Sequence, residues 1–319
     1  MKKEIFTIQE NDSGQRLDKF LLKALPSMPK SMLYKLIRKK EIKYNGQRCQ
    51  GDEMLRTGDI LQIFAKEEFF IKPEKKIIHQ ESYQFQVVFE DEKLLIVRKA
   101  AGQDAHGSVH SLIAEIQAYL HDKCEYHPQT EQSFSPALCN RIDRNTEGLV
   151  IAAKTAAALR AMAEAIRAHQ VQKTYLAVTA RPLPKKSGLC TAYLHKEENS
   201  PRVRIADAPQ GKDWHEIRTG YEVLAQNGQK QLVRVTLLTG RTHQIRAHMA
   251  FLGAPLLGDA KYGGKSDTEQ YQCLCAYQLR FSGLTSPVLA YLEGKSFSAP
   301  VPDFVKKYFP DYLSRCSAL

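Results

Sequence analysis

The sequence predicts an α+β protein that is divided into two domains. Its 319 residues exceed the usual length of a single domain. Two short helical patterns come first, a charged stretch follows at residues 67–82, and strand patterns interspersed with helices occupy the rest. We therefore expect a small domain at residues 1–66, a linker at 67–82 and a larger domain at 83–319.

The charge balance indicates a polyanionic partner. Lysine and arginine together number 46, against 35 aspartate and glutamate residues, for a net charge of +11. Such an excess favours phosphates, through neutralisation and counterion release. No stretch resembles a signal peptide or is apolar enough to span a bilayer, so we expect a cytoplasmic protein with no membrane partner. We also expect a monomer.

The cysteine content indicates free thiols in a reducing compartment. The seven cysteines are odd in number and lack C-x-x-C spacing; they are Cys49, Cys124, Cys139, Cys190, Cys273, Cys275 and Cys316. Cys273 and Cys275 are two residues apart and would lie on one side of a strand, which is only a weak indication of metal binding. We expect no metal.

The first domain should contain two helices packed on a small sheet. Apolar residues at helical spacing predict one helix over residues 16–25 and a second from about Lys30. Strands are predicted at 42–44 and 60–64, with an Asn-Gly turn after the first.

A basic cluster covers the second helix and the turn after it. Between residues 27 and 48, Glu41 is the one acidic residue among seven basic ones, which are Lys30, Lys35, Arg38, Lys39, Lys40, Lys43 and Arg48. A solvated helical face is the simpler interpretation. An RNA-binding face is the other, because phosphate contacts position a protein on nucleic acid.

Three segments of this domain resemble the alpha-L RNA-binding motif of S-four-like domains. They are R-L-D-K-F-L, S-M-P-K-S-M-L-Y-K-L-I-R-K-K-E-I-K-Y-N-G, and the G-D ahead of the second strand. The resemblance implies that the second helix and its following turn lie on RNA. It assigns contacts with the sugar-phosphate backbone of the RNA to six residues, which are Lys30, Ser31, Lys35, Arg38, Lys39 and Lys43.

The larger domain opens with a predicted hairpin. Its strands cover residues 85–90 and 94–99, and Ala101-Gly102 ends it. His106 follows in a loop, where a surface histidine is the simpler interpretation. A helix is predicted over 111–120, and the aperiodic stretch to Pro136 indicates a loop that leads to the next motif.

The most informative stretch runs from Asn140 to Lys154 and reads N-R-I-D-R-N-T-E-G-L-V-I-A-A-K. Four ionisable residues stand directly before an apolar run that should form a buried strand; they are Arg141, Asp143, Arg144 and Glu147. These side chains can satisfy one another in a turn. Carboxylates held by arginines against a buried strand are also where catalytic groups gather.

This stretch resembles the catalytic segment of the RluA-type pseudouridine synthases, H-R-L-D-x-x-T-S-G-L. The resemblance places Asp143 at the nucleophilic aspartate and implies substrate contacts from Arg141 and Thr146. The departures are Asn140, Ile142 and Glu147, and the last adds a second carboxylate without an assigned role.

Further segments match the same family in order along residues 85–300. They are K-A-A-G at 99–102, the histidine at 106, K-T-Y-L-A at 173–177 after a helix over 155–169, T-G-R-T-H-Q-I-R-A-H at 239–248 after a strand over 230–238, L-G-A-P-L-L-G-D-A-K-Y-G-G at 252–264, and L-C-A-Y-Q-L-R-F at 274–281. The resemblance implies a mainly antiparallel mixed sheet flanked by helices. It pairs Arg246 with Asp143, packs Tyr175 on the uracil, and requires no cofactor.

Residues 239–248 also have a physical interpretation of their own. A strand ending at Thr239-Gly240 and a helix opening near Thr242 would place Arg241 and His243 at a helix N-terminus, where anions bind. His243 and His248 are five residues apart without a carboxylate between them, so they do not follow a zinc pattern. His248 is as well explained by a hydrogen bond to a neighbouring strand.

The expected function is isomerisation of uridine to pseudouridine in RNA. Large-subunit ribosomal RNA is the favoured substrate, and transfer RNA is the other. Two alternatives stay open: an RNA-binding or ribosome-assembly factor without catalysis, and a hydrolase of nucleosides or glycosides. The hydrolase needs a second carboxylate as general acid, for which Glu147 is the nearby candidate.

Overall fold

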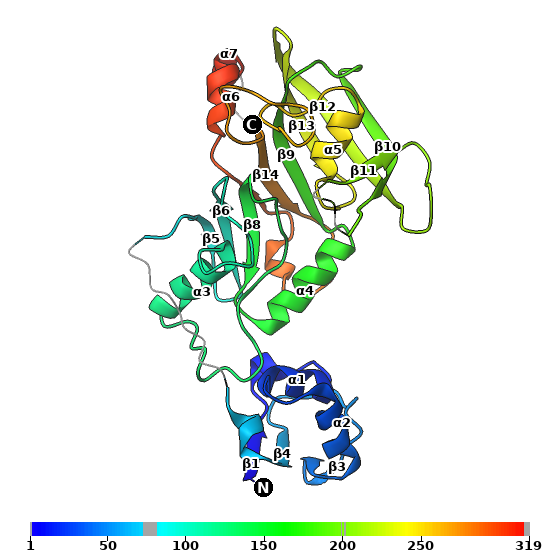
Figure 1. The fold of residues 1–319 in the computed structure, drawn as a ribbon. Coiled ribbons are helices and arrows are strands. Elements are labelled where there is room, and N and C mark those ends of the chain that lie inside the picture. The colour runs from blue at the N-terminus through cyan, green and yellow to red at the C-terminus, as the bar shows by residue number, and fades with distance from the viewer. Residues whose placement is uncertain (1, 73–81, 199, 201, 316–319) are drawn as a thin grey trace.

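The computed structural model describes residues 2–72, 82–198, 200 and 202–315 (Figure 1). A small domain holds a four-stranded antiparallel sheet with the strand order β1-β4-β2-β3. Its elements are β1 (Lys2–Thr7), η1 (Glu10–Asp12), α1 (Leu17–Ala24), α2 (Lys30–Arg38), β2 (Ile42–Tyr44), β3 (Gln47–Arg48), β4 (Ile60–Ala65) and η2 (Glu67–Phe70), where η marks a 3-10 helix.

The small domain has its own core beneath the two predicted helices. Leu17, Phe20 and Leu21 of α1 are fully buried, and Leu33 and Ile37 of α2 pack beside them. Helical spacing puts these apolar residues on one face of each helix, and burying that face stabilises both helices against the sheet.

The predicted linker begins inside this domain. Residues 67–70 form η2, and the rings of Phe69 and Phe70 lie partly buried against the small core. Lys75 and Lys76 of the predicted linker fall in 73–81, outside the described residues, and so does Cys316.

The larger domain is built on one eleven-stranded sheet. Its central order is β11-β10-β12-β13-β9-β14-β8-β6-β5, with β15 paired to β14 and β7 to β8. The strand pair β14/β8 is parallel and the other pairs are antiparallel, so the expected mainly antiparallel mixed sheet is confirmed.

The bounds of its elements are as follows. The strands are β5 (Gln86–Glu90), β6 (Leu94–Lys99), β7 (Ala137–Leu138), β8 (Glu147–Ala153), β9 (Val171–Thr179), β10 (Ser187–His195), β11 (Arg204–Ala206), β12 (His215–Asn227), β13 (Lys230–Leu237), β14 (Leu274–Phe281) and β15 (Ser296–Ser298). The helices are α3 (Leu112–Asp122), α4 (Ala156–Arg167), α5 (Gln244–Phe251), η3 (Ala290–Leu292), α6 (Asp303–Tyr308) and α7 (Pro310–Arg315).

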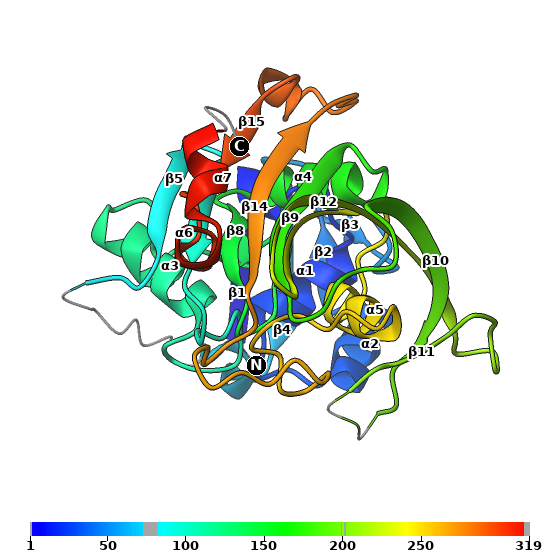
Figure 2. The same cartoon turned by 90° about the horizontal axis from the view of Figure 1, so that it is seen from above.

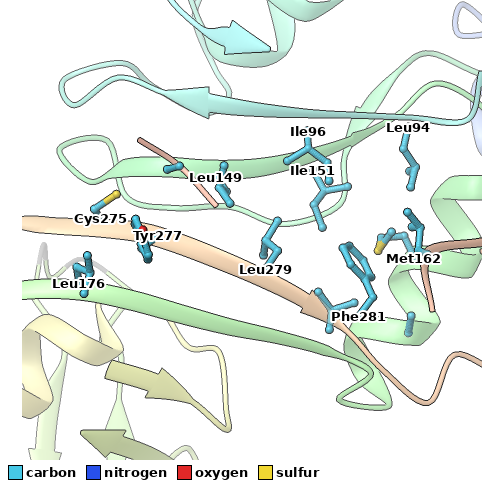
Figure 3. Packing of buried hydrophobic residues seen from close by; sticks show 14 of the residues in the cluster. Leu94, Ile96, Leu149, Ile151, Met162, Leu176, Cys275, Tyr277, Leu279 and Phe281 are labelled. Carbon is cyan, nitrogen blue, oxygen red and sulfur yellow. The ribbon is translucent and has the colours of Figure 1, made fainter. Parts of the chain in front are cut away.

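Helices cover both faces of this sheet, as Figure 2 shows from above. On one face, α4 and α6 bury a core that includes Met162, Leu279 and Phe281 (Figure 3). On the other face, α3 and α5 bury a second core that includes Ile116 and Ile245. Because successive residues of a strand point to opposite faces, neighbours such as Leu149 and Val150 divide between the two cores.

The helix expected to open near Thr242 begins two residues later. His243 takes a left-handed backbone conformation at φ 56° and acts as the N-cap of α5, so Gln244 is its first helical residue. The side chain of Gln244 accepts a hydrogen bond from Arg241 N at 3.1 Å, which holds the tight connection between β13 and α5. None of the helices in the described part of the chain is long and apolar enough to cross a membrane.

Candidate active site

A cavity of about 530 Å³ opens on the α5 face of the sheet. Its walls come from residues 139–144 ahead of β8, residues 240–246 at the start of α5, Tyr175 of β9, and His106. Segments that lie far apart in the sequence therefore meet here, and they include most of the residues singled out in the larger domain.

The loop that carries Asp143 is held from below by a buried lysine. The ammonium Nζ of Lys99 donates to the carbonyl oxygens of Ala100, Gln103 and Arg144 at 2.7, 2.9 and 2.8 Å. Burial lowers the pKa of Lys99 to about 8. The three carbonyl oxygens replace the hydrogen bonds to water that the Lys99 ammonium loses on burial. Lys99 therefore links the end of β6 to the Asp143 loop.

Arg246 bridges two carboxylates. Its Nη1 lies 3.0 Å from Asp143 Oδ2, which is the ion pair that the family resemblance implies. Its Nε and Nη2 lie 2.7 and 2.9 Å from the two carboxylate oxygens of Asp259. The bidentate pair leaves the guanidinium one orientation, and that orientation points Nη1 at Asp143.

The sequence interpretation did not assign a role to Asp259. This residue is only 1% exposed and lies after α5 in the L-L-G-D segment. The sequence held one indication of a role for Asp259, because an acidic residue that follows an apolar run can be buried, and buried carboxylates are rare unless they are paired.

Tyr262 and His243 complete a ring of contacts around Arg246. The Tyr262 ring lies over the guanidinium, with 5.2 Å between ring centroid and Arg246 Cζ. The Tyr262 hydroxyl and His243 Nδ1 are 2.9 Å apart, and His243 Nε2 is 3.9 Å from Asp143 Oδ2. Burial lowers the pKa of His243, and the charge of Asp143 opposes this shift. The His243 imidazole is therefore neutral near pH 7.

Tyr175 lies on the same face of the sheet as Asp143. Its side chain is 6% exposed and belongs to the α5-side core, as alternation along β9 requires. Burial, and then the nearby charge of Asp143, raise the pKa of the Tyr175 hydroxyl. This phenol therefore keeps its proton at neutral pH and presents a mainly apolar ring to the cavity.

Cationic side chains line the mouth of the cavity. Arg141 and Arg241 are exposed there, and burial followed by the charge of Arg141 lowers the pKa of His106. Thr146 lines the cavity as well, but its side chain is buried and accepts a hydrogen bond from Gln272 at 3.1 Å. Thr146 therefore also braces the loop.

Glu147 lies on the opposite face of the sheet. Its Oε2 accepts from Arg98 Nη2 on the neighbouring strand β6, and it does not line the cavity. The departure from the family pattern at this position has a structural explanation, because Glu147 and Arg98 neutralise each other beside Cys275.

His248, unlike His243, does not face the cavity. His248 Nδ1 lies 3.0 Å from the hydroxyl of Thr219 on β12, so the prediction of a strand-bonded histidine is confirmed. Burial lowers the pKa of His248 to about 4. Within the described residues no group of three or more His, Cys, Asp or Glu side chains could hold a metal, and Cys275 is packed in the α4-side core (Figure 3).

The basic cluster lies on the surface of the small domain. All six residues predicted to contact RNA are exposed, and in the part of the chain that the structure describes none forms an ion pair; they are Lys30, Ser31, Lys35, Arg38, Lys39 and Lys43. The charges of the five lysine and arginine side chains are therefore available to an external anion.

The match to known families follows the same division of the chain. Residues 93–251 match the family described as RNA pseudouridylate synthase, and residues 15–61 match the S4 domain.

Curated relatives share about a third of the sequence. The chain is 32% identical over 262 residues to Ribosomal large subunit pseudouridine synthase C of Vibrio parahaemolyticus, covering 81% of this chain and 79% of the relative. It is 33% identical to the protein of the same name from Haemophilus influenzae, covering 84% and 81%. It is 30% identical to an uncharacterized RNA pseudouridine synthase of Mycoplasma capricolum, covering 97% and 99%.

Two solved structures share the fold of the larger domain. Human RNA Pseudouridylate Synthase Domain Containing 4 aligns with a TM-score of 0.54 at 23% identity, covering 72% of this chain and 92% of that one. Human RNA Pseudouridylate Synthase Domain Containing 1 aligns with a TM-score of 0.57 at 20% identity, covering 73% and 90%.

Proposed function

The chain belongs to the RNA pseudouridylate synthase family, and on that premise we propose that it isomerises uridines of large-subunit ribosomal RNA with Asp143 as the reacting carboxylate. The relatives named for the large ribosomal subunit support this substrate over transfer RNA. A cytoplasmic location accords with that substrate.

One observation carries the assignment to Asp143. Its carboxylate faces the cavity and is held by Arg246, whose guanidinium is itself fixed by the buried Asp259. A carboxylate that is oriented before the substrate arrives needs little reorganisation as bonds break.

The reaction balances without an added group. The bond between N1 of the uracil and the ribose breaks, the base rotates, and C5 joins the ribose. C5 then loses its proton and N1 of the product carries one. Asp143 can form a bond to the separated partners or stabilise them, and the protonated Tyr175 packs against the base while it turns.

The mouth of the cavity suits an extruded nucleotide. Leaving the stack costs a few kcal/mol, and Arg141 can offset part of that cost by holding the phosphate of the flipped nucleotide. Arg241 lies across the same mouth and adds a second cation. Single-stranded loops and bulges are the substrates that cost least to open.

The position of Glu147 disfavours the hydrolase alternative. A glycoside or nucleoside hydrolase would use a second carboxylate as general acid beside the bond that breaks. Glu147 instead pairs with Arg98 on the other face of the sheet, and Asp259 is occupied by Arg246.

The Asp143→Asn variant tests the proposal. We expect it to make no detectable pseudouridine in large-subunit ribosomal RNA, while its affinity for that RNA stays within about threefold of wild type, because the amide keeps the shape and loses the nucleophile. Pseudouridine mapping on large-subunit ribosomal RNA and on transfer RNA measures the loss of activity. Filter binding measures the affinity for RNA. Asp104→Asn is the control, an acidic residue near the same mouth that does not line the cavity. Full activity in Asp143→Asn would exclude the assigned role.

A further inference from the structure

The small domain contacts the larger one through a polar interface. On one side it is formed by the end of β1, by η1 and by the turn after η1. On the other side it is formed by residues 131–133 and the N-terminus of α4. The hydrogen bonds are Ser133 Oγ to Asp12 Oδ1 at 2.6 Å, Ser133 N to the same oxygen at 3.2 Å, Gln15 Nε2 to Ser133 Oγ at 2.9 Å, Gln132 Nε2 to Thr7 O at 2.9 Å, Asn11 Nδ2 to Glu131 Oε1 at 3.4 Å, and Ala156 N to Asn11 Oδ1 at 3.1 Å. We call this set the docking contact.

Asp12 shows that the docking contact forms a closed interface. The residue is only 1% exposed, although it is a carboxylate in a short surface helix. One of its oxygens accepts both donors of Ser133, and the other accepts from Gln9 N at 3.3 Å. A carboxylate is buried at this level only where donors replace its water, and two of those donors belong to the other domain.

The start of α4 also uses the small domain. The first backbone N–H groups of a helix lack intrahelical partners. Thr155 accepts from Ala158 N in the usual way, whereas Ala156 N donates to Asn11, across the domain boundary. One turn further on, the Arg160 guanidinium lies over Gly14, where a Cβ atom would come within 2.9 Å of Arg160 Nη2.

The docking contact joins the two surfaces that the proposed function uses. Residues 131–133 lie in the loop that leads through β7 to the Asp143 segment, and Asp12 is followed along the chain by α1 and α2. In Figures 1 and 2 together, α2 and α5 lie along the same side of the molecule, one below the other. The helix α2 carries basic residues, and the start of α5 lines the cavity. A ligand as long as a folded RNA can span both.

We infer that the docking contact selects the uridine that is modified, and this inference rests on the proposed function. A docked small domain holds the basic cluster at a fixed distance and direction from Asp143. Only uridines that lie at this same distance and direction from the RNA segment bound by the basic cluster can then reach the cavity. A tethered but undocked domain would raise the local RNA concentration without fixing that displacement. Asp12 and Ser133 are therefore specificity-determining through position, and neither touches the substrate.

The test uses the full chain in two variants and a matched control. The Asp12→Ala/Ser133→Ala variant removes one carboxylate from η1 and one hydroxyl from the loop. The Glu10→Ala/Thr130→Ala control makes the same two changes at exposed positions that do not belong to the docking contact. A Gln132→Ala/Ser133→Ala variant changes the loop side alone and so leaves the small domain intact.

Two readouts are measured for each protein. The first is the distribution of pseudouridine over all uridines of a large-subunit ribosomal RNA transcript, together with the rate on a short stem-loop that carries the uridine preferred by the wild type. The second is NMR relaxation, which reports whether the small domain tumbles with the rest of the chain.

We expect both docking variants to lose about tenfold in preference for the wild-type uridine over other uridines, as expected for about 1.4 kcal/mol, while the stem-loop rate stays within about twofold. Their small domains should tumble faster, and the control should match wild type in both readouts. Unchanged preference in a variant whose small domain tumbles separately would overturn the inference alone, as would independent tumbling in wild type. If wild type makes no pseudouridine in either RNA, the proposed function fails, and the inference with it.

Discussion

At the residue scale, the site depends on how Arg246 is shared. Its guanidinium presents three donors to two carboxylates, two of them to Asp259 and one to Asp143. Asp259 takes the bidentate position, so Asp143 is oriented by a cation whose charge is already partly compensated. This arrangement leaves the Asp143 carboxylate held in place and still exposed to the cavity.

We predict that Asp259→Asn lowers kcat by about 10- to 100-fold, the usual cost of losing a group that orients a catalytic residue. The KM for RNA should stay within about twofold, because Asp259 is buried and does not line the cavity. Single-turnover kinetics on ribosomal RNA measure both. The control is Asp267→Asn, which removes a carboxylate charge from an exposed position in the same segment between α5 and β14. This variant should behave as wild type. Equal kinetics for the two variants would remove Asp259 from the site.

A second residue-scale prediction concerns pH and His248. Burial lowers the pKa of His248 to about 4 in the folded chain, whereas an unfolded histidine titrates near 6.5. Between these values the unfolded state binds more protons, so the free energy of unfolding falls as the pH falls. We expect His248 to account for a loss of about 2 kcal/mol between pH 7 and pH 5.

Urea unfolding at the two pH values measures this loss. In His248→Gln the dependence on pH should be weaker by about that amount, whereas in His195→Gln, a histidine of β10 for which the ring is partly exposed, it should stay as in wild type. An unchanged dependence in His248→Gln would contradict the assignment.

At the element scale, the entry of β8 into the sheet depends on one glycine. Gly148 has φ +119°, and a Cβ atom there would lie 2.4 Å from the carbonyl oxygen of Ala276. Its strand forms the parallel pair with β14 at this position, directly after the Asp143 loop. The close approach of the two backbones therefore positions the Asp143 loop against β14.

We predict that Gly148→Ala destabilises the fold by about 3 kcal/mol or more, through overpacking and a strained backbone together. Thermal or urea unfolding measures this effect. The matched substitution is Gly211→Ala, where the added Cβ would meet only Trp214 Cδ1 at 3.7 Å, an ordinary contact. A loss below about 1 kcal/mol in Gly148→Ala would show that β8 and β14 can separate there without cost.

At the scale of the whole molecule, two surfaces act on one RNA. The small domain offers exposed cations, and the larger domain offers the cavity with Asp143. The docking contact holds these surfaces at one relative position, so under our proposals affinity comes from the small domain and selection comes from the contact between the domains.

We predict that the double substitution Lys35→Gln/Arg38→Gln weakens binding to ribosomal RNA and reduces the slope of log affinity against log salt by about 0.7–0.9 for each lost phosphate contact. Filter binding between low and moderate salt measures the slope. Lys185→Gln/Lys186→Gln removes two exposed charges from the larger domain and serves as the control. Equal slopes for the two double variants would exclude a special role of α2 in RNA binding.

The sequence by itself predicted many of the elements and, through the family motifs, the residue that we propose as the reacting group. The positions of α1, α2, α3 and α4 followed from apolar residues at helical spacing, and the hairpin of β5 and β6 followed from its strand-like runs. Asp143, Arg141, Tyr175 and Arg246 followed from motifs, because the chemistry constrains those residue types locally. The strands β10, β11 and β12 were not predicted, since irregular alternation and charged residues obscure their pattern.

Only the tertiary structure decided which groups act together. Asp259 meets Arg246 across thirteen positions of the chain, a contact that no motif indicated, and it fixes the guanidinium that the family resemblance had paired with Asp143. Glu147 stands four residues from Asp143 and still points to the other face, because it belongs to β8, where alternation puts it on the side of Leu149 and Ile151, whereas Asp143 lies in the loop before the strand. Contacts between distant residues arise from packing, which no local pattern encodes, and the docking contact between Asp12 and Ser133, across 121 positions of the chain, is a further example.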